Sequence, residues 1–405
     1  MEHKYDVAII GAGPAGMMAA IYASKRDKSV VLIDKNRVPG KKLLITGKGR
    51  CNITNAQFDL NELIKNYRNG KFLYHAFFEF GPKKTLSFFK DLGLKTERGK
   101  RVFPNSDNSK DVVRFLTNKF KNVKTLYGTK VNRIKNKGNK IDKLILSKGE
   151  IEANNYIICT GGMSYPKTGS TGDGYKWLEK MGHKINNPEP ALVPMIVKED
   201  WPKKLQGLSL KNIQITFKQD KIIEKVFGEC LFTHFGISGP IVLTISERIG
   251  ECLKKGDVKA CLDLKPKIEF KTLDSRLQKG FQKMANKTFK NLLNDYLPKK
   301  IIPVFIGLSG IDPDKKVNII TKEERHKIVS LFKKIEITIT GLMGFDWAIV
   351  TKGGIDIKEI DPITMKSKIF NNLYFAGEII DINGTTGGFN LQACWSTGYL
   401  AGNNA

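Results

Sequence analysis

Three glycines near the start of the chain have the spacing of a phosphate-binding turn. Gly11, Gly13 and Gly16 follow the apolar run Val7–Ile10 in the sequence V-A-I-I-G-A-G-P-A-G. In a G-x-G-x-x-G turn, the first glycine permits a tight turn, the second lets a diphosphate approach the backbone, and the third allows close helix packing. The helix that follows, with Ala15 in its first turn, would direct free N–H groups and a positive dipole end at the phosphates.

An acidic residue stands where such a unit needs one. Asp34 ends a second expected strand, Ser29–Ile33, and lies 18 residues after Gly16. A carboxylate there can accept hydrogen bonds from the ribose hydroxyls of an adenosine, and it disfavours a 2′-phosphate. We therefore expect a dinucleotide at this unit, with Asp34 and the adjacent Lys35 among the residues that bind it.

The elements around this unit predict an interrupted domain. A chain of 405 residues exceeds the size at which one core keeps growing, so two domains are expected. The pattern predicts an α/β domain formed by residues 1–194 and 336–405. The expected insert covers residues 195–335, with a β-rich part at about 195–265 and a helical part at about 266–335.

Several elements of both domains can be predicted individually. Four short strands, Lys124–Leu126, Lys130–Ile134, Lys143–Ser147 and Glu150–Glu152, are typical of an antiparallel meander. A buried strand is expected at Asn155–Cys159. In the insert we expect strands at Ile213–Lys218, Lys221–Val226 and Val258–Leu264. Helices are expected at Thr272–Ala285, Phe289–Tyr296 and Thr321–Lys334. Thr321 and Glu324 fit a capping box.

Composition excludes some classes of function. The six cysteines form no C-x-x-C pair and no Cys/His cluster at zinc spacing, so we expect reduced thiols and no metal. The run Val7–Ala23 lacks a basic leader and contains three glycines, and no other stretch is long enough to span a bilayer. We therefore expect a cytoplasmic protein with no membrane partner. Both a monomer and a homo-oligomer fit the sequence.

The net charge of +28 suggests a polyanionic partner, but its distribution argues for a compositional origin. Lysines are spread along the whole chain together with many Asn and Ile residues. The nearest approach to a cluster, Lys119–Lys143, also fits the solvent face of the expected meander. We therefore expect a small-molecule substrate and no nucleic acid, and we keep an RNA-modifying enzyme as the alternative.

The C-terminal stretch F-A-G-E-I-I-D-I-N-G-T-T-G-G-F-N-L-Q-A resembles the end of FAD-binding domains of the glutathione-reductase type. In those domains the last strand ends in a Gly-acid pair that binds a ribityl hydroxyl. The resemblance implies this role for Gly377 and Glu378, and Asp381 could share or replace the role of Glu378.

The last expected helix, Asn390–Ala401, supplies a second electrostatic element. Gly388 keeps the backbone bare before it, and the N–H groups of Asn390, Leu391 and Gln392 would lie at the positive end of its dipole. Such donors stabilise negative charge that develops on a flavin ring when it accepts hydride.

Three further stretches extend the resemblance over essentially the full chain. They are G-K-G-R-C-N-I-T-N (47–55), C-T-G-G-M-S-Y-P-K-T-G-S-T-G-D-G-Y (159–175) and L-F-T-H-F-G-I-S-G-P (231–240). Together with the C-terminal stretch, they are similar to the aminoacetone-oxidase-like family of FAD-binding oxidoreductases, which includes enzymes described as reducing steroid-type enones. The resemblance implies a discontinuous Rossmann-type FAD domain with an inserted domain that is part β-barrel-like and part helical.

These stretches and the loop before them contain further candidate FAD-binding residues. Lys42 and Arg50 are cations that could meet the cofactor phosphate or the flavin. The remaining candidates are Gly49, Thr160, Gly161 and Gly162.

Three residues are candidates for catalysis, namely Cys51, Asn52 and His234. Cys51 has no neighbouring cysteine for a disulfide shuttle, so it is either a thiol beside the flavin or a small residue that fills space. Asn52 could hydrogen-bond the flavin or its ribityl chain. His234 is either a structural residue or a proton shuttle.

We therefore expect an FAD-dependent oxidoreductase that transfers hydride between FAD and a small organic substrate of the amine or enone type. No second G-x-G-x-x-G follows a strand after residue 162, so oxygen reoxidises the flavin or NAD(P)H visits it transiently. The alternatives are a flavin-dependent enzyme that modifies RNA, such as tRNA, and a flavin-loaded sensor without turnover.

Overall fold

The apolar run before the glycine turn forms the strand β1 (Lys4–Ile10), which has parallel neighbours on both sides. These neighbours are β2 (Val30–Asp34) and β9 (Glu150–Ile158). Val7, Ala8, Ile9 and Ile10 are buried. This is the pattern of a parallel strand covered on both faces.

The sheet continues in both directions, with the order β6-β2-β1-β9-β8-β7 and with β18 also paired to β9. The strand β6 (Val123–Tyr127) is parallel to β2, and β18 (Leu373–Phe375) is parallel to β9. β7 (Val131–Lys137) and β8 (Lys140–Leu146) are antiparallel. The prediction that residues 124–126 belong to the meander is therefore wrong, because β6 pairs in parallel with β2. The helix α5 (Ser109–Asn118), which precedes β6, provides the crossover connection that parallel pairing needs.

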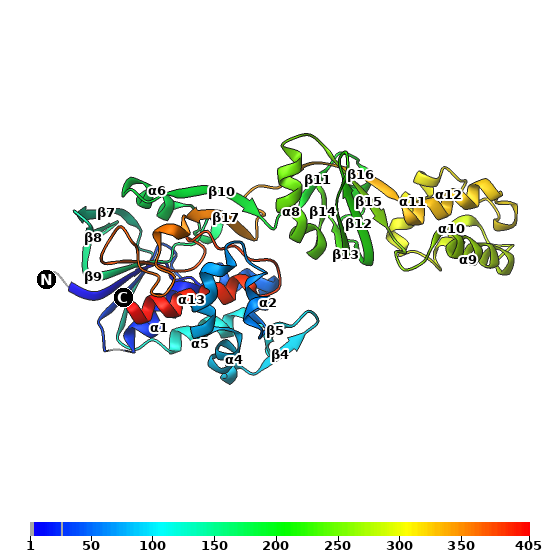
Figure 1. Cartoon of the computed structure of the whole chain (residues 1–405). Helices are drawn as coiled ribbons and strands as arrows, with labels where there is room; N and C mark the ends of the chain where they lie inside the picture. The colour runs from blue at the N-terminus through cyan, green and yellow to red at the C-terminus, as the bar shows by residue number, and fades with distance from the viewer. Residues whose placement is uncertain (1–3, 26) are drawn as a thin grey trace. The chain divides into compact units, whose positions relative to one another are not determined.

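The computed structural model describes residues 4–25 and 27–405, and their contacts divide the chain into two units (Figure 1). The first unit is Met1–Ala191 together with Gly344–Ala405, and the second unit is Leu192–Met343. The first unit is a discontinuous Rossmann-type domain, and the second is inserted into it.

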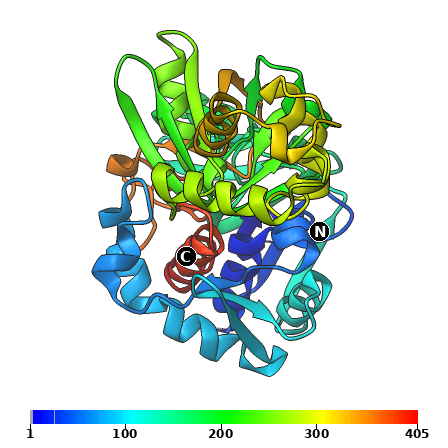
Figure 2. The ribbon, with the colours of Figure 1, turned by 90° about the vertical axis from the view of Figure 1, so that its right-hand side faces the viewer.

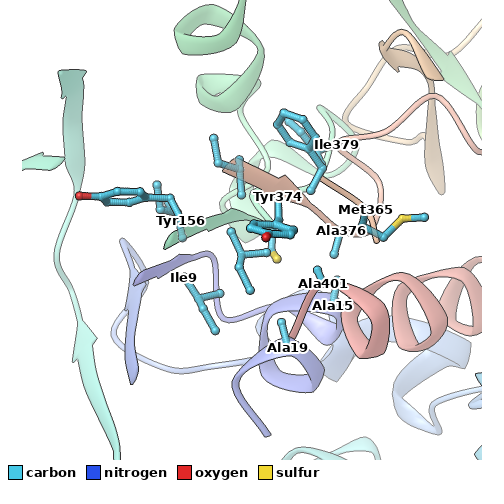
Figure 3. Close-up of a cluster of buried hydrophobic side chains, with 14 of the residues drawn as sticks. Ile9, Ala15, Ala19, Tyr156, Met365, Tyr374, Ala376, Ile379 and Ala401 are labelled. Carbon is cyan, nitrogen blue, oxygen red and sulfur yellow. The ribbon is translucent and has the colours of Figure 1, made fainter. Parts of the chain in front are cut away.

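Two helices pack side by side in the first unit (Figure 2). They are α1 (Pro14–Ser24) and α13 (Phe389–Asn404). A Cβ added to Gly398 would lie 2.4 Å from the carbonyl oxygen of Ala15, so the two backbones are almost in contact. Figure 3 shows the small side chains at this place, with Ala15 and Ala401 close together. The N-terminal and C-terminal segments are thereby joined in one core.

The other elements of the first unit surround these helices. They are β3 (Thr54–Asn55), α2 (Leu60–Ile64), α3 (Tyr74–Phe80), α4 (Pro82–Phe88), β4 (Leu94–Glu97), β5 (Arg101–Pro104), α6 (Asp173–Lys180), β10 (Ile185–Ala191) and β17 (Val350–Ile355).

No helix among residues 4–25 and 27–405 has both the length and the apolar character needed to cross a bilayer.

The second unit contains a closed six-stranded barrel with the order β11-β14-β13-β12-β15-β16. Its strands are β11 (Met195–Val197), β12 (Ser209–Lys218), β13 (Ile222–Phe232), β14 (Gly236–Ser238), β15 (Val258–Asp263) and β16 (Ile335–Leu342). The helix α8 (Pro240–Leu253) accompanies the barrel. The expected α/β fold with a barrel-like insert is confirmed.

The rest of the second unit is helical, with α9 (Phe270–Lys283), α10 (Phe289–Leu293), α11 (Ile302–Ser309) and α12 (Lys322–Lys333). The short helix α7 (Trp201–Lys204) lies before β12. The capping box of Thr321 and Glu324 is present at the start of α12. β16 completes the barrel, so the chain returns to the first unit at Gly344 and not at residue 336 as the sequence suggested.

Candidate functional site

The glycine turn between β1 and α1 has the geometry that a diphosphate needs. Gly11 has φ +106°, and a Cβ on it would lie 2.4 Å from the carbonyl oxygen of Cys159. A Cβ on Gly16 would lie 1.8 Å from the carbonyl oxygen of Gly11, so helix and strand pack without room for a side chain. A Cβ on Gly13, by contrast, would meet no atom within 4 Å. Gly13 therefore faces open space at the N-terminus of α1, where the helix dipole attracts anions.

Asp34 is held beside this turn by two backbone donors. Its Oδ2 accepts from the N–H of Ala12 at 2.7 Å, and its Oδ1 accepts from the N–H of Asn36 at 2.7 Å. Each carboxylate oxygen keeps a further lone pair that could accept from a ribose hydroxyl. Lys35 instead donates to Oδ2 of Asp173 at 2.7 Å, so its charge is paired within the protein.

Glu378, just after β18, connects four segments of the first unit. Its Oε1 accepts from the N–H of Thr351 at 2.8 Å and from the Ser164 hydroxyl at 3.1 Å. Its Oε2 accepts from Nζ of Lys42 at 3.0 Å and from the N–H of Gly162 at 3.4 Å. Lys42 and the glycine turn after β9 are therefore fixed by the acid that the sequence assigned to the cofactor.

Gly377 and Ala15 bring the end of β18 against the first turn of α1. A Cβ on Gly377 would lie 2.8 Å from the Cβ of Ala15, so only glycine fits there. The N–H of Gly377 donates to Oγ1 of Thr397 at 2.9 Å. Both residues therefore allow α1 and the end of β18 to lie close together.

Asp381 is buried and is turned toward the two-stranded antiparallel sheet of β10 and β17. Its Oδ1 accepts from the N–H of Gly353 at 3.1 Å, its Oδ2 accepts from Nδ2 of Asn186 at 3.1 Å, and Nε of Arg68 lies 3.6 Å away. These partners indicate that Asp381 anchors the segment after β18.

Thr160 and Gly161 follow β9 beside the glycine turn. Gly161 has φ +70°, a conformation that favours glycine. The buried Oγ1 of Thr160 has no hydrogen-bond partner among the described residues. A Cβ on Gly174 would lie 2.2 Å from this oxygen, so the hydroxyl faces α6.

The loop at residues 43–51 contains a run of left-handed residues. Gly47, Lys48, Gly49 and Cys51 have φ of 58°, 59°, 86° and 61°. Such values cost a non-glycine residue about 1–2 kcal/mol, and several of them close together are a feature found at ligand sites as well as in tight turns. A Cβ on Gly49 would meet no atom within 4 Å, so this part of the loop is open.

Arg50 is paired within the protein. Its Nε donates to Oδ1 of Asp107 at 2.7 Å, it forms an ion pair with Glu97, and its guanidinium lies 4.1 Å from the ring centre of Phe103. These contacts favour a role in fixing the loop and leave its predicted contact with the cofactor without support.

Cys51 and Asn52, which are adjacent in the chain, differ in their surroundings. Cys51 is fully buried, and burial raises the pKa of its thiol to about 12. The thiol thus stays protonated, which favours the space-filling interpretation. The buried Oδ1 of Asn52 has no hydrogen-bond partner among the described residues, and a Cβ on Gly388 would lie 3.0 Å from it.

Gly388 immediately precedes α13 with φ +102°, and a Cβ there would lie 2.4 Å from the carbonyl oxygen of Thr54. Bare backbone is therefore required at the start of this helix, as predicted. The first N–H groups of a helix have no partner within it. The N-terminus of α13 thus combines helix donors with the unpartnered Asn52 Oδ1.

The side chains of the first turn of α13 serve the protein itself. Asn390 accepts from the N–H of Gly384 and donates to its carbonyl oxygen, each at 2.8 Å. Gln392 donates to the carbonyl oxygen of Phe80 at 2.9 Å. Leu391 packs against the core around Trp395. The backbone N–H of Gln392 donates to the carbonyl oxygen of Gly388 at 3.1 Å, so of the three predicted N–H groups only those of Asn390 and Leu391 are left for a ligand.

His234 lies in the turn between β13 and β14 of the second unit, where it is exposed. Its ring centre is 4.8 Å from that of Phe235. Its catalytic role stays a prediction, because the other candidate residues all belong to the first unit.

Sequence reasoning missed residues that position the site. Oγ1 of Thr351 accepts from the N–H of Met163 at 2.8 Å, and the hydroxyl of Tyr175 donates to the carbonyl oxygen of Glu378 at 3.1 Å. Tyr67 donates to the carbonyl oxygen of Phe389 at 2.7 Å. Tyr175 lies in a motif noted above, but nothing in the local sequence of Thr351 or Tyr67 indicates these distant partners.

The residues present fit an adenine dinucleotide with a flavin. Gly13 leaves open space at a helix N-terminus, Asp34 is oriented for a ribose, and Asn52 offers an unpartnered buried acceptor near α13. Among the described residues, no group of three His, Cys, Asp or Glu side chains could hold a metal ion.

Known proteins match this chain over almost its whole length. Residues 5–404 match the family model described as HI0933-like protein Rossmann domain. A 3-dehydro-bile acid delta(4,6)-reductase of Clostridium scindens is 32% identical over 406 residues, which cover 98% of each chain. A ribosomal RNA dihydrouridine synthase of Haemophilus influenzae is 30% identical over 413 residues, again 98% of each chain.

A solved structure supports the fold. The crystal structure of 3-ketosteroid delta1-dehydrogenase from Sterolibacterium denitrificans matches with a TM-score of 0.54 and 12% identity, covering 99% of each chain. The expected resemblance is thus confirmed at the level of the broader family, whereas the narrower aminoacetone-oxidase-like label stays a prediction. The chain belongs to the HI0933-like family and is a flavoprotein oxidoreductase with a Rossmann-type FAD-binding domain.

Proposed function

We propose that this flavoenzyme reduces a carbon-carbon double bond that is conjugated to a carbonyl group. The observation that carries the proposal is that two relatives, each matching 98% of the chain, have names that share this chemistry. A delta(4,6)-reductase of a 3-dehydro bile acid saturates double bonds conjugated to a ketone. A dihydrouridine synthase saturates the uracil double bond that is conjugated to a ring carbonyl. The enone class of substrate is therefore favoured over the amine class.

When bound and reduced by two electrons, the flavin would supply a hydride for the carbon β to the carbonyl and would return to its oxidised form, and a proton added at the α carbon would complete the reduction. The backbone N–H groups around Gly13 would hold the diphosphate, and Asp34 would accept from a ribose hydroxyl. The N-terminus of α13 would stabilise negative charge on the ring, and Oδ1 of Asn52 would accept from a ring N–H or a ribityl hydroxyl.

The source of the hydride in this proposal is NADH or NADPH, which visits the flavin transiently. A reductase needs a donor of two electrons, and the chain has no second glycine fingerprint for a permanent nicotinamide site. In an oxidase of amines, by contrast, the electrons would move from the substrate to the flavin and then to oxygen.

The test is turnover under anaerobic conditions with NADH or NADPH and a panel of steroid enones, simple enones, free uridine and primary amines. The proposal predicts a product heavier than the enone by two hydrogens, with one nicotinamide oxidised per double bond. Aerobic oxidation of an amine with release of hydrogen peroxide, and no enone reduction, would contradict it.

A second candidate function is the reduction of uridine within RNA. It is favoured by the relative named as a ribosomal RNA dihydrouridine synthase together with the net charge of +28. In this case free uridine and steroid enones would be poor substrates, whereas RNA would gain dihydrouridine, which mass spectrometry of its nucleosides detects.

A further inference from the structure

Positive charge is concentrated in the helical part of the second unit. Residues 265–334 carry 17 Lys and Arg against seven Asp and Glu, a net charge of +10 in 70 residues. The other 335 residues share the remaining +18. The helical part thus has more than twice the charge per residue of the rest of the chain. The segment 119–143 of the first unit is denser still, with nine Lys and Arg against one acid, a net charge of +8 in 25 residues. Charge density alone therefore does not single out the helical part, and what distinguishes it is how one of its helices presents the charge.

One arc of α9 carries this charge in an ordered form. Lys271, Arg276, Lys279 and Lys283 are exposed, and no carboxylate lies within ion-pair distance of them among the described residues. Their positions fall within about 140° of the helix circumference at 3.6 residues per turn. The same arc includes the exposed polar residues Thr272, Ser275 and Gln282.

The one acid within α9 is removed from this arc. Asp274 accepts from Nε and Nη2 of Arg325 on α12, at 2.8 and 3.1 Å. The helices α9 and α12 lie next to each other in the helical part (Figure 1). The exposed arc therefore has an unbroken cationic surface about 18 Å long, at 1.5 Å per residue from Lys271 to Lys283.

The apolar face of α9 is already occupied. Leu273, Leu277 and Phe281 are buried in the core of the second unit. A helix that lies in a membrane surface needs a free apolar face to insert among the lipids. The arc therefore suits a hydrated polyanion with regularly spaced phosphates better than a bilayer.

We propose that this arc of α9 is a docking surface for the phosphate backbone of structured RNA. The inference rests on the second candidate function, and it names the element that would bind the RNA. Lysine and arginine provide the phosphate contacts, while Thr272 and Gln282 can donate to phosphate or to the ribose 2′-hydroxyl; the hydroxyl of Ser275 already donates to the carbonyl oxygen of Lys271 at 3.0 Å.

The test compares three full-length, FAD-loaded proteins in binding to bulk tRNA as a function of KCl between about 50 and 200 mM. The first is the unaltered protein. The second carries Lys271→Gln, Arg276→Gln, Lys279→Gln and Lys283→Gln. The matched control carries Arg133→Gln, Lys135→Gln, Lys140→Gln and Lys148→Gln, which remove the same charge from the exposed hairpin region of the first unit.

The proposal predicts that the α9 variant binds RNA at least about tenfold more weakly and that its salt dependence falls by about three in slope, because each phosphate contact contributes about 0.7–0.9. The control should stay within about twofold of the unaltered protein. Equal losses in both variants would show diffuse attraction and overturn the proposal, as would unchanged binding by the α9 variant.

Two further measurements separate the possible failures. Binding to vesicles of phosphatidylcholine and phosphatidylglycerol, without binding to tRNA, would identify a membrane partner and overturn the proposal. Anaerobic reduction of the bound flavin by NADH or NADPH, which needs no RNA, is measured in parallel and should be unchanged in the α9 variant, so loss of RNA binding is distinguishable from failure of the flavin site.

Discussion

FAD binding depends on the absence of a side chain at Gly13. A Cβ at this position meets no protein atom, and Gly13 has an ordinary extended backbone. We therefore expect Gly13→Val to fold normally but to lose FAD, because the added methyl groups occupy the place of the diphosphate. The ratio of flavin to protein absorbance measures this. Gly307→Val is the matched control, since Gly307 also faces open space, and full FAD retention in both variants would refute the assignment.

Substitution of Cys51 should have little effect on the reaction. Burial raises the pKa of the thiol to about 12, so no thiolate is available near neutral pH. Cys51→Ala should keep enone reduction within about twofold and lose about 1 kcal/mol of unfolding free energy from the small cavity. A loss of activity of a hundredfold or more with FAD retained would show that the thiol takes part in the reaction.

Residues whose role depends on their own backbone could be predicted from the sequence, whereas residues with distant partners could not. Gly11, Gly16 and Gly388 have the tight contacts that the motifs implied. The structure shows that the side chains of Arg50 and Gln392 bond to protein groups far away in the sequence. Spacing along the chain carries no information about such partners.

At the scale of elements, the ion pair of Glu378 and Lys42 connects β18 to the loop that precedes the motif G-K-G-R-C-N. Both side chains are mostly buried, so either Glu378→Gln or Lys42→Met leaves one charge without its partner. We expect each single variant to lose about 1–3 kcal/mol of unfolding free energy and to bind FAD more weakly.

The double variant Glu378→Gln with Lys42→Met should recover part of this loss, because neither charge remains. A double-mutant cycle from denaturant unfolding measures the coupling. Strictly additive losses would mean that the two side chains do not act together, and they would contradict this description of the loop.

A buried histidine predicts how the first unit responds to acid. Desolvation lowers the pKa of His183, although Nδ1 lies 2.8 Å from Oε2 of Glu359. Below pH of about 6.5 the unfolded chain therefore binds a proton that the folded chain does not, so stability falls as pH falls through this range. His183→Asn should melt with a shallower pH dependence between about pH 5 and 7. An equal slope in both proteins would contradict the assignment.

Most elements could be predicted, but two failures have physical reasons. The edge strand β6 has the alternating composition of a hairpin strand, and only its parallel pairing with β2 distinguishes it. The helix α8 went unpredicted, although Gly239 and Pro240 precede apolar residues at 241, 242, 245 and 249. That periodicity and the proline in the first turn are the signals that could have found it.

For the whole molecule, the fold class and the inserted barrel could be predicted because a full-length resemblance and periodicity agree. The insert ends later than the sequence indicated, because β16 pairs with β15 and β11 and so closes the barrel. The closure of a barrel depends on distant strands and leaves no local signal in the sequence. The substrate could not be predicted in the same way, because one family fold supports different substrates.

In the function proposed above, reduced flavin in this protein gives its electrons to a conjugated double bond. The most direct measurement mixes the anaerobically reduced protein with a steroid dienone in a stopped-flow instrument and follows flavin absorbance. We predict reoxidation of the flavin without oxygen, together with a saturated product in equal amount, and neither in Gly13→Val. A reduced flavin that stays reduced with every enone and with uridine-containing RNA, and that only oxygen reoxidises, would contradict the account.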